Sequence, residues 1–285
     1  MTQMKKLLLG LALALFFGGL ASADEVVVNT GSPDGKMAVA SRPDSAGKIE
    51  IEAADDFILG VQTNLVGATF TGLLPSDALV SSIQDVTVEI YRVFPNDSTS
   101  PPDGHVFTRV NSPSDVAFDS RDSGAGGLTF AATLLSSSFT ASNSVLNGIH
   151  PFPNQRTGGE GPVTGEEVQF AVSFSTVIDL PADHYFFVPQ VQLSNGDFFW
   201  LSAPRPIVPP GTPFLGDLQA WVRNADLDPD WSRVGGDIVG GTPAPAFNMA
   251  FSVNGTPASV PEPSSALLVV MGLLGLTTRF RRPAN

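Results

Sequence analysis

Cysteine is absent from this 285-residue chain, so neither a disulfide nor a zinc site with Cys ligands can form. Without disulfides, the hydrophobic core must supply the stability of the fold. Basic residues are scarce, with 15 Lys and Arg against 28 Asp and Glu and a net charge of −13. The part of the chain between its ends is more acidic still, because five basic residues lie close to the termini: Lys5, Lys6, Arg279, Arg281 and Arg282. Nucleic acids and anionic lipids bind basic surfaces, and we expect neither as a partner of the body.

Common catalytic motifs are also missing. The chain has no Gly-x-Ser-x-Gly, no His-Glu-x-x-His and no phosphate-binding glycine loop. Its three histidines, His105, His150 and His184, do not have the spacing of metal ligands. A glycosidase needs only two carboxylates about 5 to 10 Å apart, so 28 acidic residues leave that reaction open. We predict that the chain is not an enzyme and has no cofactor, with calcium as the one candidate ion.

Long apolar runs are confined to the two ends of the chain. Near the N-terminus, two lysines precede an apolar run over residues 7–17, and a small-residue segment follows, ending in Ala21, Ser22 and Ala23. These are the three parts of a secretory signal peptide. A first transmembrane helix is the alternative, but the run is short and acidic residues follow it. We therefore predict a signal peptide over residues 1–23, read by the export machinery and cleaved before Asp24.

The C-terminal end combines a proline motif, an apolar run and an arginine cluster. The motif is Val260-Pro261-Glu262-Pro263, the run covers residues 266–276, and the cluster is Arg279, Arg281 and Arg282. The prolines disfavour helix and keep the motif extended. Residues 266–278 are fewer than the roughly 20 of a membrane-spanning helix, so a buried core helix is an alternative. Three arginines argue against burial, and we expect membrane insertion with the arginines on the cytoplasmic side.

This C-terminal combination resembles the PEP-CTERM sorting signal of Gram-negative bacteria, over residues 260–285. The resemblance implies recognition by an exosortase, a membrane-embedded protease-transferase, in bacteria that make extracellular polysaccharide. It also implies a transient anchor in the inner membrane, followed by transfer to the cell surface or the biofilm matrix. The body resembles, more weakly, domains of other proteins with this signal, through residues 53–57, 68–72, 86–92 and 246–255. No catalytic motif accompanies that resemblance.

The body, residues 24–258, has the periodicity of β-strands. Val168, Phe170, Val172 and Phe174 alternate with small or polar residues, which is typical of a half-buried antiparallel strand. The same alternation occurs in residues 86–91 and 247–253. Further strands are expected over residues 48–53, 68–73, 128–135, 185–193 and 198–202. Many short strands separated by Gly and Pro predict one antiparallel β-sandwich or jelly-roll-like domain with long loops. A signal helix and a sorting helix, residues 1–23 and 259–285, would flank it.

Two local features predict the connections. Asn195-Gly196 suits a type I′ turn, so we expect a hairpin between the strands on either side of it. Residues 114–118 are the best candidate for a short helix. Four long connections are rich in Pro, Gly, Asn and Ser, and they form either a binding face or plain surface loops: residues 95–113, 147–165, 203–216 and 235–245.

Acidic residues form two candidate sites. Asp226, Asp228 and Asp230 follow Asn224 at every second position, a spacing that would let their oxygens converge on calcium. The loop has no bidentate Glu further on, and a solvated acidic loop is the alternative. Asp55-Asp56 is the other candidate, as a metal or sugar contact, although a role at the end of a strand is favoured because adjacent strand residues point to opposite faces.

Three tryptophans, Trp200, Trp221 and Trp231, are candidate stacking surfaces for carbohydrate, since flat rings pack against sugar faces. Burial in the sandwich core is the alternative for all three. The sequence thus supports two hypotheses of different classes. The first is an exported surface or matrix-associated protein whose molecular activity it does not define. The second is a module that binds extracellular polysaccharide through loop and Trp residues, with calcium as a candidate aid.

Overall fold

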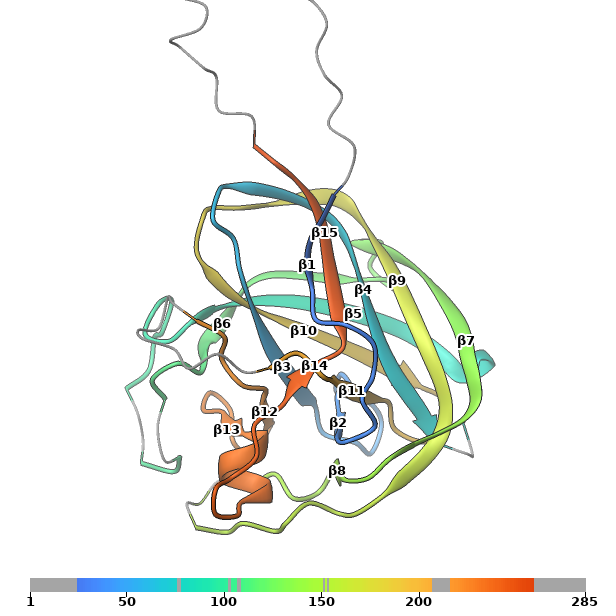
Figure 1. Ribbon diagram of the computed structural model, residues 1–285. Coiled ribbons are helices and arrows are strands. Elements are labelled where there is room, and N and C mark those ends of the chain that lie inside the picture. The colour runs from blue at the N-terminus through green and yellow to red at the C-terminus, as the bar shows by residue number, and fades with distance from the viewer. Residues whose placement is uncertain are drawn as a thin grey trace, which may run out of the picture.

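Two β-sheets packed face to face form the body of the protein (Figure 1). The computed structural model describes residues 25–75, 78–101, 104–106, 109–150, 152, 154–206 and 216–258. The prediction of an all-β sandwich is confirmed. The two predicted flanking helices fall on residues 1–23 and 259–285, which lie outside the described residues. No helix within the described ranges has the length and apolarity needed to cross a bilayer.

The larger sheet has nine strands. Its main path runs in the order β1 (Glu25–Asn29), β15 (Phe251–Pro257), β4 (Thr63–Pro75), β11 (Phe199–Ala203), β2 (Ala38–Ala40) and β8 (Ser144–Val145). Three strands branch from this path: β14 (Asn248–Met249) pairs with β11, β9 (Val163–Leu180) pairs with β4, and β7 (Leu128–Ala141) pairs with β9. All of these pairs are antiparallel except β2 with β8.

The smaller sheet has six strands in the order β13 (Ser232–Arg233), β12 (Trp221–Asn224), β3 (Ile51–Ile58), β10 (His184–Leu193), β5 (Ile83–Val93) and β6 (Pro113–Asp122). Its pairs are all antiparallel. The described helical segments are short, namely the 3₁₀ turn η1 (Val80–Ser82) and the π-helical turn η2 (Val234–Val239).

Alternating side chains build the core between the sheets. On β9, Val168, Phe170 and Val172 are buried while Gln169 and Ala171 are exposed, as the sequence predicted. Aromatic rings from both sheets meet in the middle, with Phe187 of β10 stacked on Phe251 of β15 at 5.2 Å between ring centres. One face of each long strand packs into this core, so a one-residue slip in register would turn the apolar side chains of that face toward solvent.

The smaller sheet is also covered on its outer face. A second hydrophobic cluster lies there, consisting of Ala54, Tyr91, Val93, Phe186, Val188, Leu218, Trp221 and Trp231. Neighbours of these residues along the strands, such as Ala53 and Phe187, belong to the central core instead. Strand β10 is therefore buried on both faces, which explains its unbroken run of apolar residues from Tyr185 to Val188.

The predicted Asn195-Gly196 hairpin was wrong. Strand β10 ends in the six-stranded sheet and β11 begins in the nine-stranded sheet, so the turn carries the chain from one sheet to the other. Gly196 does adopt a positive φ of 72°. Asp197 holds this crossing in place, because its Oδ1 lies 2.9 Å from both Arg42 Nη1 and Lys48 Nζ. Asn195 does not adopt a positive φ, so the turn is not the predicted type I′, which requires a positive φ at both central residues.

The predicted helix at residues 114–118 was also wrong, because these residues belong to β6. This strand pairs with β5 and lies at the edge of the smaller sheet. Buried Trp231 donates a hydrogen bond from Nε1 to the carbonyl of Ser114 at 3.3 Å. Pairing with β5 and contact with a distant tryptophan thus outweigh the weak local preference for helix.

The two ends of the body emerge together. Strands β1 and β15 pair antiparallel, with Glu25 opposite Gly255. In Figure 1 both strands lead to the upper end of the sandwich, while η2 and the connection between β8 and β9 lie at the lower end. Segments that precede residue 25 and follow residue 258 therefore attach to the same end of the body.

Candidate functional site

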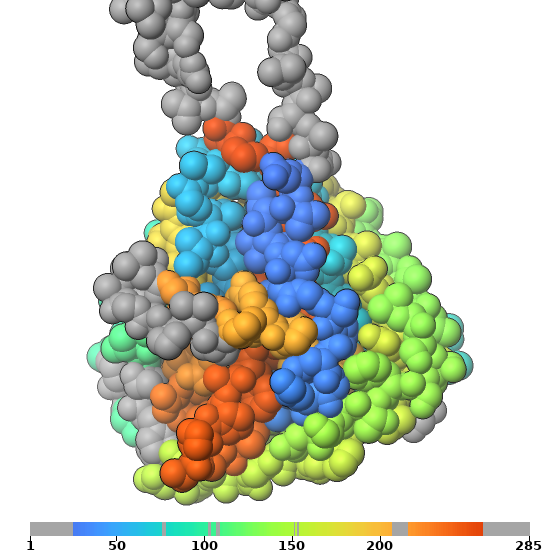
Figure 2. All heavy atoms as spheres, in the orientation of Figure 1, coloured from blue at the N-terminus to red at the C-terminus, as the bar shows by residue number. Residues whose placement is uncertain are grey.

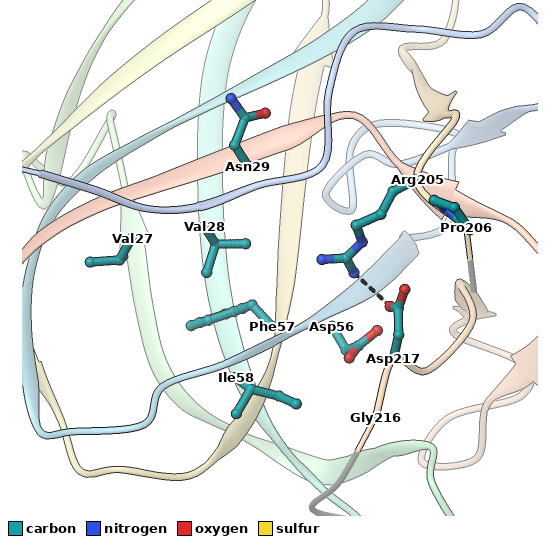
Figure 3. A pocket seen from close by; sticks show the side chains of 10 residues that line it. All are labelled: Val27, Val28, Asn29, Asp56, Phe57, Ile58, Arg205, Pro206, Gly216 and Asp217. Carbon is teal, nitrogen blue, oxygen red and sulfur yellow. Dashed lines mark hydrogen bonds and ion pairs between the residues drawn. The ribbon is translucent and has the colours of Figure 1, made fainter. Parts of the chain in front are cut away.

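The candidate site is a cavity of about 630 Å³ on the side of the sandwich, between β1 and the end of β3. Its lining residues are Val27, Val28, Asn29, Asp56, Phe57, Ile58, Arg205, Pro206, Gly216 and Asp217. Figure 3 shows these side chains around the opening, with Arg205 and Asp217 on one side and the valines of β1 on the other. In Figure 2, β1 runs down the front face of the molecule beside the orange segment that follows residue 216.

The open edge of β3 explains where this cavity forms. Strand β12 pairs with β3 only from Asn224 opposite Ile51 to Trp221 opposite Ala54. Beyond that point, Asp55 and Asp56 have no β12 residue beside them, and the chain around Asp217 passes over the gap. The lining of the cavity is largely apolar, and its charged residues are Asp56, Arg205 and Asp217.

Both Asp55 and Asp56 are buried in the middle of β3, with exposed fractions of 0% and 1%. The expectation that they mark the end of a strand was therefore wrong, although they do point to opposite faces. Asp56 Oδ2 lies 2.6 Å from Nε2 of buried His184. Asp55 Oδ2 accepts a hydrogen bond from the backbone N–H of Met249 in the other sheet, at 2.7 Å. The Oδ1 atoms of both carboxylates have no hydrogen-bond partner among the described residues.

Asp217 and Arg205 complete the polar part of the cavity. Arg205 Nη2 lies 2.6 Å from Asp217 Oδ1, and Asn248 Nδ2 donates to Asp217 Oδ2 at 3.1 Å. Burial raises the pKa of Asp217 to about 6, and the charge of Asp56 adds to this shift while Arg205 opposes it. Burial also raises the pKa of Asp55 well above its usual range, with the charge of Asp56 as the second cause. Of these groups, Asp56 and Asp217 line the cavity, whereas Asp55 lies on the opposite face of β3 and bonds to the other sheet.

This arrangement can accept hydrogen bonds from hydroxyl or ammonium groups while the apolar wall contacts the rest of a ligand. A largely apolar pocket with a few convergent polar groups and perturbed carboxyl groups is the usual form of a small-molecule site. Only Asp55 and Asp56 were singled out from the sequence. Their partners His184, Arg205 and Asp217 lie more than 120 residues away in the chain, and no local pattern connects them.

The three tryptophans do not form a stacking face. Trp200, Trp221 and Trp231 have exposed fractions of 0%, 2% and 0%. Trp200 packs between the sheets and donates a hydrogen bond from Nε1 to the carbonyl of Ala250 at 3.0 Å. The prediction that these rings stack on carbohydrate was wrong, because a buried ring presents no face to a sugar. Trp200 belongs to the core between the sheets, as the alternative had it, whereas Trp221 and Trp231 are buried in the second cluster on the outer face of the smaller sheet.

The acidic loop does not bring its carboxylates together. Asp230 is buried, and its Oδ1 lies 2.8 Å from Nε of Arg109. Asp228 lies 2.7 Å from Nη1 of Arg223, and Asp226 is exposed to solvent. Asn224 uses its side-chain oxygen to accept the backbone N–H of Leu227. The loop oxygens therefore serve different partners. In the part of the chain that the structure describes, no group of three or more His, Asp or Glu residues is arranged to hold a metal ion.

The remaining predicted site residues belong to the termini and lie outside the described residues. They are the signal-cleavage residues Ala21, Ala23 and Asp24, and the sorting residues Val260, Pro261, Glu262, Pro263, Arg279, Arg281 and Arg282. The body bears on these terminal segments through the position of its two ends, with Glu25 opposite Gly255.

Comparison with known proteins adds no functional assignment. No protein-family model, no curated protein and no solved structure matches this chain.

Proposed function

We propose that this chain is an exported protein that a PEP-CTERM-type tail directs to the cell surface or the extracellular matrix. In this proposal the signal peptide is removed after Ala23, and the tail anchors the protein transiently in the inner membrane. An exosortase-like protease then processes the tail near Pro261-Glu262-Pro263. The single observation that carries the proposal is the order of motif, apolar run and arginine cluster at residues 260–282.

The position of the two ends supports this proposal. Because Glu25 lies opposite Gly255, the signal peptide and the sorting tail attach to the same end of the sandwich. A membrane that holds the tail would face that end, and the opposite end, with η2 and the β8–β9 connection, would point away from it. No part of the folded body has to pass between the tail and the membrane.

Peptide mapping of the protein from a bacterium with an exosortase tests the proposal. The mature protein should begin at Asp24 and lack the arginine cluster. Replacing Glu262 by Ala should leave the tail intact and the protein in the membrane fraction, while the matched change Glu25→Ala, in the first strand of the body, should leave processing of the tail unchanged. Released protein that still ends in Arg281, Arg282 and the residues after them would contradict the proposal.

The second candidate function is the binding of a polysaccharide or a sugar in the Asp56–Asp217 cavity. It is favoured by one observation, the carboxyl groups of Asp56 and Asp217 among the lining residues of a largely apolar cavity. Sugars combine donor hydroxyl groups with apolar ring faces, and both have a counterpart in this cavity. The cavity is not lined by any of the three tryptophans, so this binding hypothesis does not depend on them. The proposed binding includes no catalytic step.

Retention of the purified protein on polysaccharide from its host tests the second function, first with calcium and then with chelator. Asp217→Asn should weaken saturable retention, and Asp226→Asn, a change of an exposed carboxylate, should not. Retention that chelator abolishes would involve calcium, and retention that survives it would not. If Asp217→Asn and Asp226→Asn behave alike, binding does not use this cavity.

A further inference from the structure

Strand β7 is a long edge strand. It pairs with β9 along one side, from Leu128 opposite Phe174 to Ala141 opposite Val163, and no other described strand pairs with it. In Figure 1 it forms the outer margin of the nine-stranded sheet, and in Figure 2 the same green segment lies at the surface. Its outer side therefore presents backbone N–H and C=O groups that another strand could pair with.

The composition of β7 lacks the usual protection of an edge. Natural edge strands carry charged residues, especially Lys, or Pro, which prevent pairing with a further strand. Leu128–Ala141 reads LTFAATLLSSSFTA and contains no charged residue and no Pro. Leu134 and Leu135 have exposed fractions of 47% and 50%. In an acidic chain with a net charge of −13, a neutral edge of this length is suited to another neutral edge.

The amino-acid sequence of the first half of β7 also reads nearly the same forwards and backwards. Residues 128–134 read Leu-Thr-Phe-Ala-Ala-Thr-Leu, which is symmetric about Ala131 except for Phe130 and Ala132. These seven residues pair with β9 in an unbroken register, whereas the register shifts after Leu134 and again after Ser136. Such bulges bend a strand and interrupt its pairing. The part of the edge that can pair regularly is thus the part that matches itself.

We propose that a second copy of this chain pairs antiparallel with β7 through residues 128–134, about a twofold axis at Ala131. The two nine-stranded sheets then continue into one sheet across the pair. Exposed Leu134 comes to lie opposite Leu128 of the partner subunit, and Thr129 lies opposite Thr133 of the partner subunit. A symmetric interface needs a self-complementary patch, and the symmetric sequence supplies it. A partner of another kind would gain nothing from that symmetry.

Cysteine cross-linking tests this pairing, because the chain has no cysteine of its own. In the proposed register Ala131 faces its own copy with the Cα atoms about 4.5 to 5.5 Å apart, within the range of about 4.4 to 6.8 Å that a disulfide spans. The matched control is Ala171, which is exposed and lies opposite Ala131 on β9. Two copies of Ala171 would be three strand spacings apart, about 14 Å.

The full-length chain with Ala131→Cys should form a covalent dimer under mild oxidation, at least about tenfold faster than the chain with Ala171→Cys. Equal rates for the two variants, or no dimer with Ala131→Cys while Ala171→Cys reacts, would overturn the proposal. Covalent dimers of Ala131→Cys that form only at the rate of random collision would also count against it, and would leave β7 available to a different partner.

Charge exchange at the same position supplies an independent measurement by sedimentation velocity. Ala131→Lys and Ala131→Glu should each weaken self-association about tenfold, because like charges oppose each other across the axis. Mixing the two variants should restore it, and Ala171→Lys should associate as the natural chain does. Association of the natural chain should strengthen with added salt, since salt screens repulsion between the acidic bodies. Monomers at every concentration, or no recovery in the mixture, would refute the pairing.

Discussion

Removal of the Arg223 guanidinium tests the reasoning about the outer face of the smaller sheet. The Arg223 residue on β12 is only 6% exposed, and it forms an ion pair with buried Glu52 on β3. Its Nη2 donates a hydrogen bond to Tyr91 Oη at 2.8 Å, and its guanidinium lies 4.5 Å from the centre of the Trp231 ring. Arg223→Met keeps most of the apolar stem and removes these interactions.

The expected cost is large because Glu52 remains behind. It has an exposed fraction of 3% and lies close to Glu89, so its charge would lose its main compensation. Breaking a buried ion pair by removing one partner costs about 3 to 5 kcal/mol. Replacing both partners removes the unpaired charge, so the double variant Glu52→Gln with Arg223→Met should recover about 2 kcal/mol or more of that loss.

Equilibrium unfolding in urea at pH 7 measures these free energies, with the m-value as a check that the folded state is unchanged. Lys36→Met is the control, because Lys36 is mostly exposed and its pair with Asp34 at 3.3 Å should contribute less than about 1 kcal/mol. A cost below about 1 kcal/mol for Arg223→Met, or a double variant less stable than the single one, would refute the argument that Glu52 depends on this cation.

Three further predictions concern packing and titration. Trp200→Ala should cost about 3 to 5 kcal/mol in urea unfolding, because the ring is fully buried between the sheets, and a cost below about 1 kcal/mol would place it outside the core. Gly72→Ala should destabilise the fold strongly, since a Cβ there would overlap the ring of Phe198, whereas Gly60→Ala, with nothing within 4 Å, should change stability little. Burial raises the pKa of Glu89 from 4.5 to about 8, so the folded state holds its proton longer and the free energy of unfolding should fall as pH rises across that interval. Glu89→Gln should flatten this slope, and an unchanged slope would contradict the assignment.

Alternation along the chain was enough to predict most of the long strands. The pattern at Val168, Phe170 and Val172 reports a strand with one face buried, and the structure has those side chains in the core. The predicted strands fall within or overlap the observed ones because period-two burial depends on neighbours in the sequence. The same local information did not identify the sheet to which each strand belongs. Both β10 and β11 are apolar, and only packing against one shared core separates them into different sheets.

The candidate cavity shows the corresponding limit for the site. Asp55-Asp56 was visible as an acidic pair in an apolar strand, but its depth was not, because burial depends on what covers the strand. Asp217 and Arg205 arrive from a segment about 150 residues later in the chain. They pair beside the part of β3 that β12 does not cover, and burial at that place raises the pKa of Asp217.

The sequence by itself determined the chemistry of the chain: a Cys-free acidic body, strands with one apolar face, an uncharged β7, and terminal segments of the kind that predict export and sorting. Tertiary structure alone decided where these properties act. It buried all three tryptophans, divided the acidic loop between two arginines, and left β7 at the margin of a sheet. The physical reason is that composition and periodicity are local, whereas exposure, ion pairing and edge position depend on residues that are distant in the sequence and close only in the fold.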